Sequence, residues 1–244
     1  LRGSASTRYG TDAIAGAIDA HPTAPERDPK LAGFGIRPRL YTRYDSASDE
    51  YGGRAQVDLQ TSPRLGVFGG IGYRTVDLLR SGGPVYSPTR GELPEVPRFD
   101  EDGVTQLGTG FDEVTGDVRI AYELTPDLDL VVAAYNYRQT DAPRTDQCAP
   151  PFAPANECLT YDEQFRTVAF AGLDGGFGDA VRDMQLRLSW QRQHERRTHE
   201  RPDSFTVNGG RDDVDTVGIR FVAATRPFDL GPNAVFVQSY GADL

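Results

Sequence analysis

Residues 114–139, VTGDVRIAYELTPDLDLVVAAYNYRQ, decide the fold. From Val114 to Leu124, apolar and polar residues alternate, which gives an extended segment one apolar face and one polar face. Thr125-Pro126-Asp127 has the composition of a tight turn, and a second apolar-rich segment follows it as far as Gln139. The pattern predicts two antiparallel strands joined by that turn.

Similar segments lie on both sides of this hairpin, and no stretch has a convincing helical pattern. Short turns at 61–64, 125–128, 177–183 and 227–232 alternate with long polar connections at 79–109, 140–163 and 195–212, while 46–52 is shorter. The predicted strands are residues 34–45, 53–61, 65–73, 114–124, 128–139, 165–176, 184–191 and 216–226, with a ninth beginning near residue 233.

Two all-β architectures produce such alternation. A soluble sandwich packs its apolar face into a core, whereas a membrane barrel turns that face outward to lipid. The segments here are longer than the five or six residues that are typical of sandwich strands. Short turns at one end and long loops at the other are typical of outer-membrane barrels. Both features favour an antiparallel transmembrane β-barrel. Tyr44, Tyr73 and Trp190, with Tyr135 and Tyr137 at a similar height, would form its interfacial aromatic belt.

Composition excludes several other classes. The net charge of −10 argues against a nucleic-acid partner, because no basic patch is left over for phosphates. No apolar run approaches the eighteen or so residues of a membrane helix. No nucleophile elbow, phosphate loop or dinucleotide fingerprint is present. The family resemblance described below likewise implies neither an enzyme nor a cofactor.

The start of the chain, RGSASTRYGTDAIAGAI (2–18), holds a further motif. It resembles the end of the plug domain of TonB-dependent outer-membrane receptors, whose motif reads Arg-Gly-Pro-x-Ser-x-x-Tyr-Gly-x-x-Ala-x-Gly-Gly-Val-Ile. Ser4, Ala15 and Ala17 depart from it. The matching residues are Arg2, Gly3, Ser6, Tyr9, Gly10, Ala13, Gly16 and Ile18. Tyr9, Gly10, Gly16 and the neighbouring Asp12 would hold the plug's shape against the barrel wall.

The resemblance implies a plug tail and linker at 1–30 and the N-terminal, roughly nine-stranded part of the barrel at 31–244, as a fragment cut at both ends. It implies active import of a scarce nutrient across the bacterial outer membrane, energised by the TonB protein. The partners would be outer-membrane lipid, TonB and a small nutrient ligand. The substrate stays open among iron-siderophore, haem, cobalamin and glycan. The alternatives are a passive porin or adhesin barrel and a secreted soluble β-rich binding protein.

Charged residues alternate with the apolar rows and would line a wet lumen and hold the plug; the solvated face of an ordinary sheet is the alternative. The long connections 79–109 and 140–163 would capture the ligand. The predicted lumen-facing charges are Arg37, Arg39, Arg43, Arg54, Asp58, Arg119, Glu123, Arg187 and Arg220, with Arg74 and Asp117 on the same face.

Cys148 and Cys158 are the two cysteines of the chain and lie in one Pro/Ala-rich loop. We expect them to form a local disulfide in an oxidising compartment, with zinc binding as the alternative. His194 and His199 are five residues apart, which favours a polar loop over a metal site. The acidic run 100–102 could hold calcium, but a solvated loop is the better interpretation, so no metal is expected.

Overall fold

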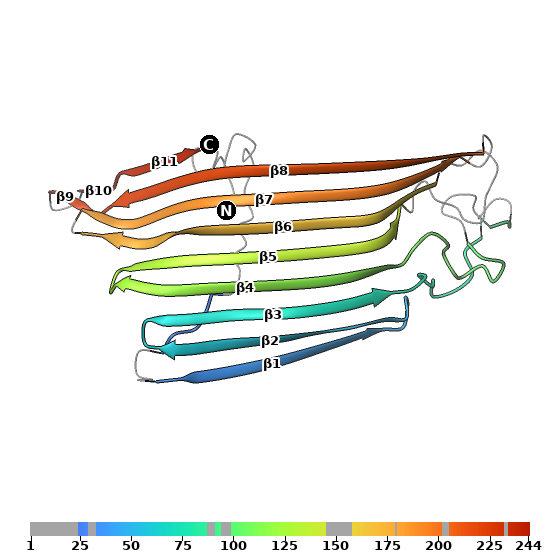
Figure 1. Ribbon diagram of the computed structural model, residues 1–244, viewed down its shortest axis with the longest axis horizontal. Coiled ribbons are helices and arrows are strands. Elements are labelled where there is room, and N and C mark those ends of the chain that lie inside the picture. The colour runs from blue at the N-terminus through green and yellow to red at the C-terminus, as the bar shows by residue number, and fades with distance from the viewer. Residues whose placement is uncertain are drawn as a thin grey trace.

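The computed structural model describes residues 24–28, 33–86, 91–93, 99–144, 158–178, 180–201, 205–231 and 234–244. Nine strands form one antiparallel sheet in the order β1-β2-β3-β4-β5-β6-β7-β8-β11, and β9 and β10 form a separate two-stranded sheet. The nine strands lie side by side in a single layer, with β1 and β11 at its two edges (Figure 1). The strands are β1 Gly35–Asp45, β2 Glu50–Ser62, β3 Leu65–Val76, β4 Phe111–Thr125, β5 Leu128–Pro143, β6 Cys158–Phe177, β7 Val181–Arg201, β8 Thr206–Thr225, β9 Phe228–Gly231, β10 Ala234–Phe236 and β11 Ser239–Asp243.

The all-β class and the nine antiparallel strands agree with the prediction, but several predicted connections were wrong. Residues 195–201 and 206–212 belong to β7 and β8, not to a loop, and β5 and β6 both extend into 140–163. The ninth strand of the large sheet is β11, which lies beyond the predicted start. The extensions of β7 and β8 consist largely of polar residues on both faces, so side-chain alternation does not reveal them. They pair nonetheless through the backbone, from Glu195↔Asp212 to Arg201↔Thr206.

The connections differ in length at the two ends of the sheet (Figure 1). The short turns β2–β3, β4–β5 and β6–β7 gather at one end, and the longer connections gather at the other, called here the loop end. The described part of the β3–β4 connection is fastened to the β1–β2 hairpin. Asp77 N donates to Ser48 O at 2.9 Å, and Arg80 N donates to Ala47 O at 2.6 Å.

An aspartate turn shapes the same connection. Asp102 accepts hydrogen bonds from the Thr105 hydroxyl at 2.6 Å and from the backbone N–H groups of Thr105 and Val104 at 2.8 Å. The Thr105 hydroxyl, followed by these two N–H groups, holds the pKa of Asp102 below its usual range. This carboxylate is therefore committed to local structure.

One face of the sheet, called the apolar face, carries exposed hydrophobic side chains on all nine strands. The cross-strand register aligns them: Leu40 pairs with Ala55, Ala55 with Ile71, and Tyr73 with Val114. Water-soluble proteins rarely expose a large contiguous apolar patch, so an exposed apolar face this wide is unusual for a water-soluble sheet. Its exposed members include Ile36, Leu40, Tyr44, Tyr51, Ile71, Tyr73, Val118, Leu188, Val217, Ile219 and Tyr240.

These exposed residues form a band of limited height. On β1 the row from Ile36 to Tyr44 is about 26 Å long, at about 3.3 Å per residue. Across the sheet the upper limit of the band moves along the strands. On β1 this limit, toward the loop end, is Tyr44. On β7 and β8 it is Trp190 and Val217. The cross-strand pairs that start at Trp190 end on β1 at Pro38, six residues before Tyr44. The limit of the band is therefore inclined by about 30° from the perpendicular to the strands, for strands about 4.8 Å apart.

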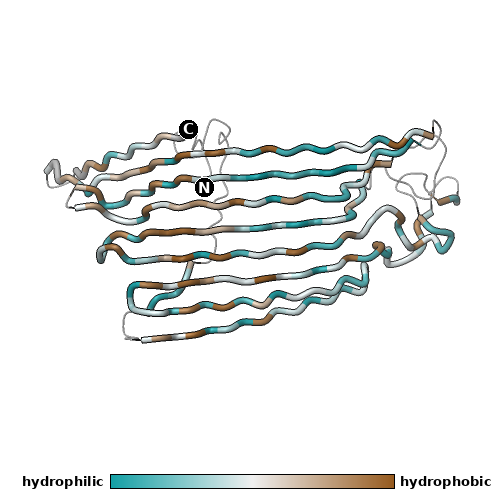
Figure 2. The backbone as a smooth tube through the Cα atoms, viewed as in Figure 1, coloured by the Kyte–Doolittle hydropathy of each residue, from teal (hydrophilic) through white to brown (hydrophobic). Residues whose placement is uncertain are grey.

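Beyond the band, toward the loop end, the same face becomes charged on β6–β8, and the hydrophilic colour in Figure 2 becomes prominent there. Trp190 Nε1 donates to Asp215 Oδ1 at 3.1 Å. Asp213 contacts His194 Nδ1 at 2.8 Å and also accepts from Arg211 and Arg192. The contact with His194, followed by the two arginines, lowers the pKa of Asp213.

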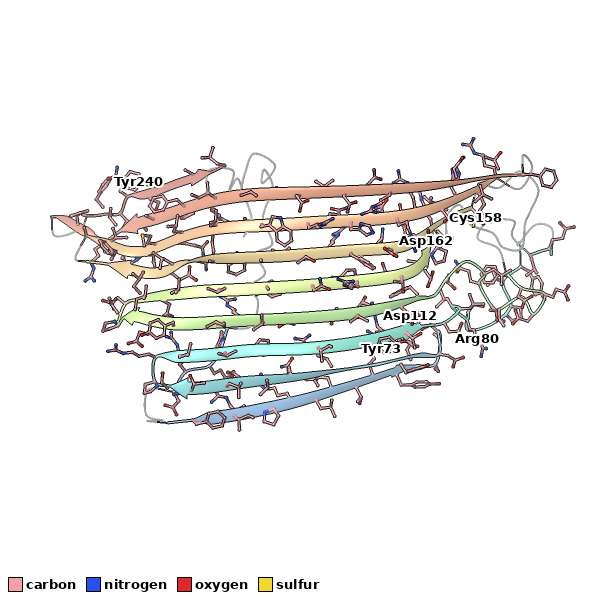
Figure 3. The ribbon with its side chains drawn as sticks, viewed as in Figure 1. Tyr73, Arg80, Asp112, Cys158, Asp162 and Tyr240 are labelled. Atoms are coloured by element: carbon pink, nitrogen blue, oxygen red, sulfur yellow. The ribbon has the colours of Figure 1, made fainter. Side chains whose placement is uncertain are left out.

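Tyr73 and Trp190 lie at the loop-end limit of this band, as predicted for an aromatic belt. Tyr73 donates from its hydroxyl to Asp112 at 3.0 Å near the loop end, whereas Tyr240 lies at the other end (Figure 3). Tyr135 and Tyr137 were wrongly grouped with them. The register places both on the opposite face, opposite Asp117 and Thr115.

Close strand packing at Gly172 generates a testable prediction. A Cβ at this position would overlap the Leu186 carbonyl oxygen across the β6–β7 ladder. Gly172→Ala should therefore lower the free energy of unfolding by about 1–3 kcal/mol, measured by equilibrium urea unfolding. Gly209→Ala is the matched control in β8, where nothing lies within 4 Å, and should change stability by less than about 0.5 kcal/mol. Equal losses in the two variants would contradict the β6–β7 packing described here.

Candidate functional site on the polar face

The opposite surface of the sheet, called the polar face, holds the predicted lumen-facing charges. Register alignment puts Arg37, Asp58, Phe68 and Arg119 in one cross-strand row. Arg187 and Arg220 lie directly opposite each other on β7 and β8. All nine predicted charges occupy positions of this face: Arg37, Arg39, Arg43, Arg54, Asp58, Arg119, Glu123, Arg187 and Arg220.

Residues 24–28, called the N-terminal segment, lie against this face. The Asp58 carboxylate is 1% exposed, and its two oxygens accept the Glu26 N–H at 3.1 and 3.3 Å. Arg37 lies 3.6 Å from the same carboxylate and donates to the Glu26 carbonyl at 2.9 Å. Both main-chain polar groups of Glu26 are therefore bound by side chains of the sheet.

Gln60 binds both main-chain polar groups of Asp28, two residues further along the segment. Its Oε1 accepts the Asp28 N–H at 2.8 Å, and its Nε2 donates to the Asp28 carbonyl at 2.9 Å. Gln60 is 0% exposed, so both hydrogen bonds form away from water, where an unpaired amide would be costly. Asp58 and Gln60 lie two residues apart on β2, as do Glu26 and Asp28 on the segment. The segment is thus held as an extended chain.

Side chains of the segment add charge and packing. The Glu26 carboxylate pairs with Arg37 Nε and with Arg39 Nη2, both at 3.2 Å. Arg27 forms an ion pair with Asp129 on β5. Pro25 is buried, and a Cβ added at Gly66 would lie only 2.9 Å from its Cβ. The absence of a side chain at Gly66 therefore lets the segment approach β3 closely.

Gly66 belongs to a row of three polar-face glycines on β3, called the glycine row: Gly66, Gly70 and Gly72. The segment covers the Gly66 end. Over Gly70, Arg54 reaches from β2 to Asp117 on β4, with Nη2 2.5 Å from Oδ1. A Cβ at Gly70 would lie 2.6 Å from that Nη2. The glycine row thus lets an ion pair span β3 at its middle.

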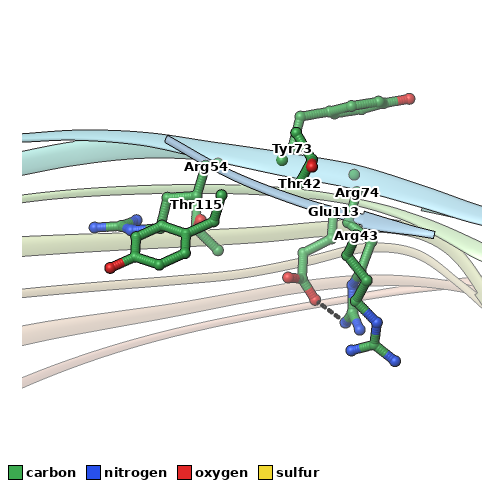
Figure 4. A pocket seen from close by; sticks show the side chains of 11 residues that line it. Thr42, Arg43, Arg54, Tyr73, Arg74, Glu113 and Thr115 are labelled. Atoms are coloured by element: carbon green, nitrogen blue, oxygen red, sulfur yellow. Dashed lines mark hydrogen bonds and ion pairs between the residues drawn. The ribbon is translucent and has the colours of Figure 1, made fainter. Parts of the chain in front are cut away.

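A cavity of about 360 Å³ lies at the Gly72 end of the row. Arg74 pairs with Glu113 at 2.6 Å on its wall, and Figure 4 shows these two side chains beside Arg43, with Tyr73 pointing away from them. The lining residues are Tyr41, Thr42, Arg43, Gly52, Gly53, Arg54, Gly72, Tyr73, Arg74, Glu113 and Thr115. The cavity offers both hydrogen-bond donors and acceptors over a floor of glycine backbone.

Sequence reasoning missed several residues of this site. Gln60 and Glu113 could have been found, because each alternates with a predicted apolar row. Glu26, Arg27 and Asp28 gave no local signal, since their partners are distant in sequence.

Other predicted features fall elsewhere or outside the described residues. The plug-motif residues Arg2, Gly3, Ser6, Tyr9, Gly10, Asp12, Ala13 and Gly16 lie outside them. Cys158, at the loop end of β6, is disulfide-bonded, but its expected partner Cys148 also lies outside them, so the pairing stays a prediction (Figure 3). The expected loop at His194–Glu200 was wrong, since β7 includes it.

Searches of the described residues for two other kinds of feature gave negative results. No group of three or more His, Cys, Asp or Glu residues there is placed to hold a metal ion. In the same ranges, no helix is long and apolar enough to cross a membrane.

Comparison with known proteins gave no match to a family model, a curated protein or a solved structure.

The contacts of Gln60 generate a second prediction. Gln60→Ala removes both hydrogen bonds to Asp28 and should speed amide hydrogen exchange at Asp28 by roughly tenfold or more. Gln56→Ala is the matched control on the same strand and face, because Gln56 bonds Arg54 and not the segment. Unchanged exchange in Gln60→Ala would mean that the segment is not held there in solution.

Proposed function

We propose that this protein imports a scarce nutrient across the outer membrane of a Gram-negative bacterium, as part of a TonB-dependent β-barrel. The observation that supports this proposal most strongly is the division of the sheet into two faces. One face is apolar and exposed, and the other is polar and holds the chain's own N-terminal segment. A barrel wall needs lipid-compatible side chains outside and polar side chains inside.

The shape of the apolar band supports the membrane part of the proposal. The row on β1 is about 26 Å long along the strand, which at a slope of about 30° corresponds to a height of about 23 Å, close to the apolar band of about 25 Å on outer-membrane barrels. Strands of such barrels tilt by roughly 35–45°. A band of constant height must therefore cross them obliquely, and the observed slope of about 30° is close to that tilt.

Two observations support import over passive flow. Residues 2–18 resemble the plug motif of TonB-dependent receptors. Residues 24–28, which follow that motif along the chain, are bound on the polar face by Asp58, Gln60, Arg37 and Arg39. A segment attached in this way to the inner wall would tie a plug to the barrel and place it inside the lumen.

The membrane location can be tested with one charge placed on either face of β7. Leu188 is 58% exposed on the apolar face. In a lipid-facing position between the interface and the midplane, Leu188→Arg should cost roughly 1–3 kcal/mol, seen as a smaller folded fraction in lipid vesicles under urea. The control Gln191→Arg, on the polar face of the same strand, should change little. A harmless Leu188→Arg would contradict a lipid-facing apolar face, because exposed surface changes in water cost less than about 0.5 kcal/mol.

Import can be tested in the bacterium that carries the gene for this chain. The gene and tonB are deleted separately, and uptake of ferric siderophores, haem, cobalamin and oligosaccharides is compared with the parent strain. The two deletions should abolish uptake of the same nutrient.

Uptake that depends on the gene but not on tonB would indicate a passive channel. If deletion of the gene changes uptake of none of these nutrients, import of this kind is the wrong function.

A further inference from the structure

The two ends of the glycine row are alike, but one is filled and the other is open. At the filled end, an arginine pair on β1 binds the Glu26 carboxylate, and Asp58 and Gln60 on β2 bind the main chain of the segment. Pro25 and Arg27 rest on Gly66, where no side chain intervenes. This end therefore binds an extended, acidic peptide by its backbone and by one carboxylate.

The open end repeats these components around the cavity. Arg43, again on β1, is 62% exposed and contacts Glu50 through Nε at 3.1 Å. Among the residues that the structure describes, the two Nη groups of Arg43 form no ion pair with an acidic side chain. Arg43 thus has the donors that a carboxylate would occupy, as Arg39 has for Glu26.

Acceptors for a main-chain N–H are also present at the open end. Glu113 lines the cavity and pairs with Arg74 through Oε2. Glu50 is 4% exposed, yet its Oε1 has no hydrogen-bond partner of good geometry within the described residues, although Arg43 and Arg74 lie within ion-pair distance. A buried acceptor in this state suggests an incomplete network, since such groups are nearly always satisfied in folded proteins.

The floor of the cavity allows a chain to lie close to the strands. Gly52 and Gly72 occupy neighbouring polar-face positions of β2 and β3, and a Cβ at Gly72 would lie 2.7 Å from Thr115 Oγ1. A side chain there would fill the space over β3. The two ends differ in what lies nearest the glycines: Pro25 and Arg27 of the segment at Gly66, but Thr115 of the sheet itself at Gly72.

We propose that the cavity at the Gly72 end is a second binding site, for an extended peptide that carries a carboxylate side chain. The peptide carboxylate binds Arg43, a main-chain N–H bonds Glu113, and the peptide backbone lies over Gly52 and Gly72. Arg54 and Asp117, bridged across Gly70, separate this site from the N-terminal segment. Peptide binding here does not depend on transport, and its test is independent of the test of import.

The probe is a fluorescein-labelled peptide with the sequence of residues 23–29, TAPERDP, capped at its free end. It is titrated by fluorescence anisotropy into the full chain in detergent micelles. We expect saturable binding, and a peptide with Gln in place of its Glu should bind at least about tenfold more weakly, since it loses a charge-assisted hydrogen bond. Absence of saturable binding, or equal affinity for the two peptides, would overturn the proposal.

Four variants locate the bound peptide. Arg43→Gln should weaken binding at least about tenfold, and Arg43→Lys, which keeps the charge, should restore most of the affinity. Arg182→Gln, at an exposed position at the start of β7 where Arg182 pairs with Asp183, should leave it unchanged. If Arg39→Gln weakens binding and Arg43→Gln does not, the peptide enters the filled end by displacing residues 24–28, and the second site does not exist. Circular dichroism of each variant confirms that the sheet is intact.

Discussion

The structure depends on the register between neighbouring strands of one antiparallel sheet. Side chains alternate between two faces, so a shift of one residue in any strand pair would move its apolar row onto the polar face and its arginines onto the apolar face. The rows Arg37–Asp58–Phe68–Arg119 and Leu40–Ala55–Ile71 show that the register is held across neighbouring strands. Both the exposed apolar band and the contacts of the N-terminal segment follow from this single alignment.

The polar face shows how such a sheet can contain many charges. Arg54 reaches Asp117 over Gly70, Arg74 lies between Glu113 and Glu50, and Arg37 lies between Asp58 and Glu26. Removing one member of such a pair leaves an uncompensated charge, so the network favours one arrangement of side chains over others. The buried Asp58 accepts a main-chain N–H in addition, which ties the position of the segment to the arginine network.

The sequence predicted the sheet best where apolar and polar residues alternate, as in β4 and the lower half of β7. The prediction ended β7 too early, just after Trp190. Arg192, His194 and Arg196 follow on the same face, and a charged run resembles a loop. There the backbone ladder persists, and cross-strand pairs such as Arg196–Glu163 at 2.9 Å replace the hydrophobic rows. Local pattern cannot detect this, because the stabilising partner belongs to a neighbouring strand.

The candidate site was predictable only in part, for a similar reason. Alternation placed the nine charges on one face, but the residues 24–28 look like an ordinary Pro-rich linker, and their partners lie 32 residues away in the case of Asp58 and Gln60. One local signal was present and was not used: in LGVFGGIGY (65–73), glycine occupies three of the four alternate positions from 66 to 72, with Phe68 at the fourth. Glycines on one face of a strand, interrupted here by Phe68, leave gaps between the side chains of that face, and such gaps allow another chain to approach the backbone.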